Sequence, residues 1–67
     1  MEIIVNNEKI KVEENTTLQQ LLQQIRGEKL NGLAVAVNNA VIPRSQWEKK
    51  QLNLNDNVLI IQATQGG

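Results

Sequence analysis

The last two residues of the chain, Gly66 and Gly67, are the ones whose type and spacing point most directly to chemistry. They follow an uncharged segment, and the chain ends "IIQATQGG". Glycine makes up about 7% of average sequences, so a terminal pair arises by chance roughly once in two hundred chains. Because glycine lacks a Cβ atom, such an end can extend through a narrow channel. We therefore expect Gln65 and Gly66 to enter a partner's active site and carry the Gly67 carboxylate into it.

That carboxylate needs activation before it can react. A terminal carboxylate has a pKa of about 3.5, so it is ionised at neutral pH and is a poor electrophile. A mixed anhydride with AMP, formed by another protein, would make the carbonyl carbon of Gly67 reactive. The sequence thus predicts a substrate for a partner enzyme that consumes ATP.

Other catalytic groups are scarce in this sequence. The 67 residues include no Cys and no His, which excludes a thiolate nucleophile, a Cys-based zinc site and the usual general base. The hydroxyl groups therefore have no His to activate them. The adjacent Glu13 and Glu14 are expected to point apart as a solvated turn. We expect no catalytic residue, no metal site and no bound cofactor.

The charge balance limits the classes of partner. Seven basic and seven acidic residues give a net charge of zero, whereas nucleic-acid binding requires a basic surface. A membrane-surface role would need the same cations. The sequence has no basic-then-apolar leader and no apolar run near 18 residues, about the length that spans a bilayer. The expected location is the cytoplasm, and the expected state of the free chain is a monomer.

The first half of the chain predicts a hairpin followed by a helix. Residues 3–5 and 10–12 are short, largely β-branched runs on either side of an Asn-Asn pair that suits a tight turn. Thr17 is the expected N-cap of a helix, with Gln20 completing a capping box and Gly27 ending it. The helix presents one apolar stripe, formed by Leu18, Leu21, Leu22 and Ile25.

The second half predicts three more strands. Residues 33–37 form a strand, a second Asn-Asn pair forms a turn, and a short strand stops at Pro43. A helical turn is expected near Trp47, which we place in the core because it is the sole aromatic residue. The less favoured alternative is that Arg44 and Trp47 form a binding pair. The last strand is expected over residues 58–64, entered through turn residues 55–57.

The predicted order is β-β-α-β-β-β, which indicates an α+β domain. The two hairpins flank a crossover, so we expect a mixed sheet of four to five strands with one helix on one face. The first and last strands are expected to lie parallel at its centre. This is the β-grasp, or ubiquitin-like, arrangement. The domain is predicted to span residues 1–64, followed by a flexible tail at residues 65–67.

One face of this sheet is left without a helix. The runs 3–5 and 58–61 are continuously apolar, so alternate residues must point away from the helix. The residues that we assign to this uncovered face are Ile4, Ala36, Leu59 and Ile61. Scattered exposed aliphatic residues are normal, but a contiguous patch indicates a protein partner. We favour a partner interface, provided that none of these side chains is buried under the helix.

At this point the chain resembles the small sulfur carrier proteins of thiamine biosynthesis (ThiS type). The resemblance covers essentially the whole chain. It rests on the capped segment "TLQQLLQQI", on "AVNNAVIPRSQW" and on the terminal Gly-Gly pair. The Gly-Gly end is shared by the wider ubiquitin-like superfamily. Asn55 stands where the family usually has glycine, and Asn can adopt the same turn.

The resemblance implies a specific role for the tail. An E1-like adenylyltransferase would use ATP to convert the Gly67 carboxylate to an acyl adenylate. Sulfur originating from a cysteine desulfurase would replace AMP and leave a thiocarboxylate. Thiazole synthase would then take that sulfur for thiazole formation. The chain would be a carrier and co-substrate of its partners, and not an enzyme.

Three alternatives remain open from the sequence. The small subunit of molybdopterin synthase uses the same tail chemistry but typically has a longer chain with aromatic residues. A protein tag or a tRNA-thiolation carrier would also use Gly67. A β-grasp interaction domain with an inert tail belongs to a different class, and it predicts that removal of Gly67 has no functional effect.

Overall fold

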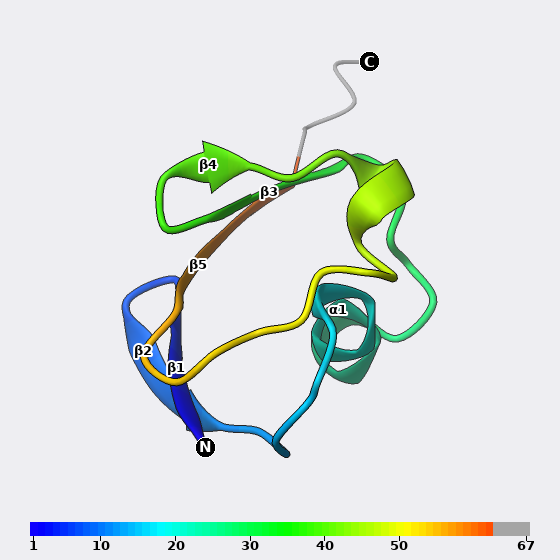
Figure 1. Cartoon of the computed structure of the whole chain (residues 1–67). Helices are drawn as coiled ribbons and strands as arrows, with labels where there is room; N and C mark the ends of the chain where they lie inside the picture. The colour runs from blue at the N-terminus through cyan, green and yellow to red at the C-terminus, as the bar shows by residue number, and fades with distance from the viewer. Residues whose placement is uncertain (63–67) are drawn as a thin grey trace.

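Five strands form a single mixed sheet, and one helix crosses one of its faces (Figure 1). The computed structural model describes residues 1–62. The elements in chain order are β1 (Glu2–Val5), β2 (Glu8–Lys11), α1 (Leu18–Arg26), β3 (Leu33–Val37), β4 (Ala40–Val41), the 3₁₀ turn η1 (Arg44–Gln46) and β5 (Asn57–Gln62). The strand order across the sheet is β2-β1-β5-β3-β4, with β1 and β5 parallel and the other neighbours antiparallel. The predicted β-grasp arrangement is confirmed.

Both hairpins turn through an Asn-Asn pair. Asn6 and Asn7 have φ angles of 49° and 70°, and Asn38 and Asn39 have φ angles of 50° and 71°. Two consecutive residues with positive φ produce the tight turn whose twist matches that of the flanking strands. Asparagine tolerates this conformation better than other residues with a side chain. The turns therefore fix the register of β1 with β2 and of β3 with β4.

The helix begins and ends at the predicted residues. The hydroxyl of Thr17 accepts a hydrogen bond from the backbone N–H of Gln20 at 3.2 Å, and the Gln20 side chain accepts one from the Thr17 N–H at 3.0 Å. This capping box satisfies N–H groups that the first turn leaves without partners. Gly27 ends the helix with a φ of 64°. Three of the four stripe residues are buried, but Ile25 in the last turn is 42% exposed.

The core lies between α1 and the sheet. Its members are Ile3, Val5, Val12, Leu18, Leu21, Leu22, Leu30, Val35, Val37, Trp47, Leu52, Val58 and Ile60. Trp47 is 1% exposed and donates its indole N–H to the Ile42 carbonyl at 2.8 Å. Since this indole is enclosed, the prediction that Trp47 is a core residue is confirmed.

The segment that follows η1 lies on the same side of the sheet as α1. The Leu18 and Gln19 N–H groups donate to the Lys50 and Trp47 carbonyls at 2.8 and 3.0 Å. Leu52 is buried in the core. Within residues 1–62, neither this segment nor the helix covers the opposite face, which is therefore open along the central strands (Figure 1).

Some strand boundaries differ slightly from the predicted ones. Val12 follows the end of β2, although its N–H still donates to the Met1 carbonyl at 2.8 Å. Asn57, expected in the turn, is the first residue of β5. Asn55 provides the turn itself with a φ of 67°, as expected for an Asn that replaces glycine. The predicted extension of this strand to residue 64, and the domain boundary there, lie outside the described residues.

Candidate functional site

The strand that leads to the C-terminal tail lies in the middle of the sheet. β5 pairs with β1 on one side and with β3 on the other. Gln65, Gly66 and Gly67 lie outside the described residues, so their predicted roles stay predictions. The structure shows that β5, the strand that precedes the tail, is paired with a neighbouring strand along both of its edges.

Asn6 holds β5 where the pairing with β1 ends. The paired residues of β1 and β5 are Ile4 with Asn57 and Val5 with Val58. Beyond them, the Asn6 side-chain oxygen accepts a hydrogen bond from the Ile60 N–H at 2.8 Å, and its Nδ2 donates to the Ile60 carbonyl at 3.2 Å. The amide thus acts as one further residue of the ladder. It prolongs the support of β5 toward the tail.

The side chain of Asn38 likewise forms hydrogen bonds at the start of β5. Its side-chain oxygen accepts a hydrogen bond from the Asn57 N–H at 2.9 Å, and its Nδ2 donates to Asp56 at 2.9 Å. The other carboxylate oxygen of the buried Asp56 accepts from the Asn53 N–H at 2.7 Å. The first Asn of each turn therefore contacts β5. This is a structural reason for the repeated "VNN" in the sequence.

The four predicted interface residues lie on the open face, but not as one group. Leu59 and Ile61 are 48% and 54% exposed, and Ala36, opposite Leu59, is half-buried. Ile4 is also half-buried, but it pairs with Asn57 and Lys9 and does not face Leu59 directly. The structure therefore brings three of the four together, and Ile4 lies beside them.

A shallow apolar hollow of about 150 Å³ is formed on this face. The residues that line it are Ala34, Val35, Ala36, Val41, Leu59 and Ile61. Its floor lies over β3, where Ala34 and Ala36 leave space between the larger side chains of β5 and Val41. We call these residues without the buried Val35 the open-face patch. They are contiguous, and all except the half-buried Ala36 are exposed, as expected for a surface that binds a protein.

Sequence reasoning missed two members of the open-face patch. Ala34 lies two residues from Ala36, so it shares the same face of β3 by simple alternation. Val41 pairs with Ala36 because the Asn38-Asn39 turn contains two residues. It is 75% exposed. Both residues could have been found from the predicted hairpin register.

Charged residues border the patch on the side of β1 and β2. Ile4 pairs with Lys9, and Glu2 pairs with Lys11. These residues share the open face, because Ile3 and Val5 are the β1 residues that point into the core. A partner that covers the patch would therefore meet an apolar centre and a largely basic rim along β2.

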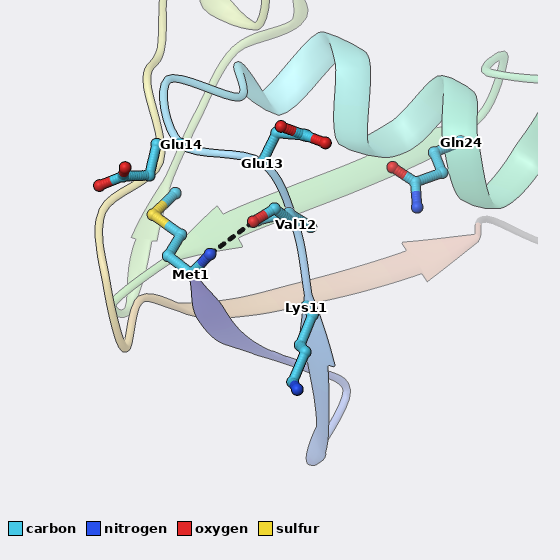
Figure 2. A pocket seen from close by; sticks show the side chains of 6 residues that line it. All are labelled: Met1, Lys11, Val12, Glu13, Glu14 and Gln24. Carbon is cyan, nitrogen blue, oxygen red and sulfur yellow. Dashed lines mark hydrogen bonds between the residues drawn. The ribbon is translucent and has the colours of Figure 1, made fainter.

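A wider hollow elsewhere on the surface is polar. Figure 2 shows its lining, in which the N-terminal ammonium group of Met1 donates to the Val12 carbonyl at 2.6 Å. The carboxyl groups of Glu13 and Glu14 turn away from each other (Figure 2), and both residues are exposed. The two carboxyl groups therefore point apart, as the sequence predicted, and they do not form an acid–base pair.

Other candidate sites find no support in the described part of the chain. Arg44 lies over the Trp47 ring at 5.7 Å from its centroid and donates to the Asn31 side chain at 2.9 Å. Because the indole is buried, this contact covers the core and leaves no open aromatic surface. Residues 1–62 contain no cluster of three or more acidic, His or Cys side chains suited to a metal. Nor is any helix among them long and apolar enough to cross a bilayer.

Comparison with known proteins agrees with this fold. A crystal structure of the thiamine biosynthesis protein ThiS from Geobacter metallireducens superimposes with a TM-score of 0.85 at 22% identity, covering all of both chains. A solution structure of a thiamine biosynthesis protein from the same organism gives a TM-score of 0.79 at 20% identity. That comparison covers this whole chain and 88% of the other.

The sequence comparisons extend the agreement to the family. The chain is 30% identical to the sulfur carrier protein ThiS of Escherichia coli (strain K12) over 67 residues, which is all of both chains. The model of the ThiS family matches residues 1–67, and this match includes the terminal glycines. The resemblance that the sequence motifs indicated is thereby confirmed, and the chain belongs to the ThiS family.

Proposed function

We propose that the protein is a sulfur carrier of thiamine biosynthesis that bears sulfur on the carboxyl group of Gly67. A partner adenylyltransferase joins this carboxylate to AMP and releases pyrophosphate from ATP. The terminal sulfur of a persulfide formed by a cysteine desulfurase then displaces AMP to give an acyl disulfide, and a thiol reductant cleaves this disulfide to leave a thiocarboxylate on Gly67. Thiazole synthase consumes that sulfur, so the chain acts as a co-substrate and not as an enzyme.

The observation that carries this proposal is the match to the ThiS family over residues 1–67. It extends through Gly66 and Gly67, the residues that the chemistry requires. The relative from Escherichia coli, named a sulfur carrier protein, aligns over the same 67 residues. The absence of Cys and His from the sequence also fits a protein whose activating chemistry is supplied by others.

The open-face patch is the proposed docking surface for these partner enzymes. Its exposed side chains lie on β5, on the adjacent strand β3 and on β4, which pairs with β3. A partner that binds there holds the strand from which the tail continues. The Lys9 and Lys11 side of the face favours a partner whose matching rim is acidic.

A growth experiment tests the proposal. A strain that lacks its own carrier and requires thiazole should grow without thiazole when it expresses the full chain. It should not grow when it expresses the chain without Gly67. The control is Leu54→Gln, an exposed position outside the open-face patch, which keeps both terminal glycines and should still support growth. Growth with the truncated chain, at equal protein levels, would contradict the proposal.

A further inference from the structure

The loop between α1 and β3 contains a feature that the carrier function does not use. Asn31 is the one asparagine of the sequence that is followed by glycine. Both Asn31 and Gly32 are exposed, and they form the turn that precedes Leu33 at the start of β3. Asparagine is among the thermolabile residues of proteins. Its side-chain amide is attacked most readily when the next residue has no Cβ atom to hinder the approach.

We propose that Asn31 is a site of spontaneous deamidation in the folded protein. The backbone nitrogen of Gly32 attacks Cγ of Asn31, forming an N–Cγ bond. The Cγ–Nδ2 bond breaks, and the amide nitrogen leaves as ammonia after taking up the proton that the Gly32 nitrogen loses. Water then opens the resulting five-membered imide. The products are aspartate, or isoaspartate with one extra methylene group in the main chain.

The backbone hydrogen bonds of the described residues distinguish Gly32 from residues that follow other asparagines. Within residues 1–62, the Gly32 N–H donates no hydrogen bond to another group. By contrast, the backbone N–H groups that follow Asn15 and Asn55 donate to backbone carbonyls at 3.3 and 3.0 Å. A backbone N–H that is already bonded must give up that bond before it can attack. Within residues 1–62 the Gly32 N–H has no such bond to give up, and its φ of 78° lies where glycine is favoured.

Arg44 provides the second part of the inference. Its Nη1 donates a hydrogen bond of 2.9 Å to Oδ1 of Asn31. When the Gly32 nitrogen adds to Cγ, negative charge develops on this same oxygen. A guanidinium group already placed there stabilises that charge, as a donor in an oxyanion hole does. Arg44 therefore promotes the reaction, and it faces the carboxylate if aspartate is the product.

The modification changes charge and backbone at one place. The net charge, zero in the unmodified chain, becomes more negative by one. The isoaspartate product lengthens the main chain two residues before Leu33. Because β3 supplies Ala34 and Ala36 to the open-face patch, the altered turn lies directly before a strand of the proposed docking surface.

The test is an ageing experiment on the folded protein. Wild type is incubated in mildly alkaline buffer, then analysed by ion-exchange chromatography, intact mass and peptide mapping. We expect a more acidic species about 1 Da heavier, since an acid replaces an amide. Peptide mapping should assign the change to Asn31, and Asn31→Asp should elute with the aspartate form. Asn31→Gln serves as the control and should not produce the species.

The results that would overturn the inference are specific. If folded wild type stays unmodified while urea-unfolded wild type deamidates at Asn31, then the fold protects the residue and the proposal is wrong. Modification spread evenly over the other asparagines would also contradict it. Arg44→Gln should accumulate the species several-fold more slowly than wild type. Equal rates in the two proteins would remove Arg44 from the proposal.

Discussion

At the scale of single residues, the side-chain amide of Asn6 forms the hydrogen bonds of greatest sequence separation within residues 1–62. It forms two hydrogen bonds with the backbone of Ile60, a residue 54 positions away. Its neighbour Asn7 has the same kind of backbone conformation, with a φ of 70°, but its side chain forms no hydrogen bond within residues 1–62. Both residues therefore provide the backbone conformation of the turn, but only Asn6 also binds β5 through its side chain.

This difference gives a matched pair of variants. Asn6→Gly and Asn7→Gly both keep a residue that accepts positive φ, but only the first removes the contacts with Ile60. We expect Asn6→Gly to lower the free energy of unfolding by about 1–2 kcal/mol more than Asn7→Gly does. Urea denaturation followed by circular dichroism measures both values. Equal effects would show that the Ile60 contacts add nothing to stability.

Substitutions of Trp47 test the packing of the core. Trp47→Phe removes the hydrogen bond to the Ile42 carbonyl and leaves that acceptor without its partner, which costs about 1–3 kcal/mol. Trp47→Ala also leaves a cavity and should cost about 3–5 kcal/mol. Circular dichroism is the suitable probe, because Trp47 is the sole tryptophan and its fluorescence is lost in both variants. Unchanged stability in Trp47→Ala would contradict the enclosed position of the ring.

At the scale of elements, the two faces of β5 have different tasks. Val58 and Ile60 are buried beneath α1, whereas Leu59 and Ile61 are exposed in the open-face patch. Substitutions on the buried side should therefore change stability, and substitutions on the open side should change partner binding. The small Ala34 and Ala36 of β3 add the hollow into which a partner side chain can fit.

The open side can be tested with Leu59→Gln and a matched exposed leucine. Leu54 is 62% exposed and lies outside the patch, so Leu54→Gln is the control. Both variants should keep the free energy of unfolding within about 0.5 kcal/mol of wild type. Only Leu59→Gln should slow adenylation by the partner enzyme, by about tenfold if the side chain contributes roughly 1.4 kcal/mol to docking. Equal adenylation rates in the two variants would remove Leu59 from the interface.

Much of the arrangement of elements could be predicted from local patterns. Each Asn-Asn pair indicates a two-residue turn, and such a turn fixes which residues pair across the hairpin. The Thr17 and Gln20 spacing marks the start of α1, and Gly27 marks its end. These signals are read within a few residues of the chain, so they do not depend on the rest of the fold.

The remaining features depend on contacts between distant segments. Nothing near Asn6 in the sequence indicates that its amide reaches Ile60, because the contact exists only once β1 and β5 are parallel neighbours. In the same parallel register, Ile4 pairs with Asn57 and does not lie opposite Leu59. Ile4 is therefore beside the open-face patch and not within it. Ile25 fits the helical period, yet it is exposed at the end of α1.

At the scale of the whole molecule, the domain supports β5, the strand from which the C-terminal tail continues. The core and the capped helix pack against one face of the sheet, the neighbouring strands hold β5 along both edges, and the open face carries an apolar patch. Membership of the ThiS family gives this arrangement its proposed purpose. The central claim is that the Gly67 carboxyl group carries sulfur.

The most direct measurement is the intact mass of the protein after incubation with its adenylyltransferase, ATP and a sulfur donor. The account predicts a gain equal to the replacement of one oxygen by sulfur, absent without ATP and absent from the variant that lacks Gly67. An unchanged mass, with a partner enzyme that is active on another carrier, would contradict the account.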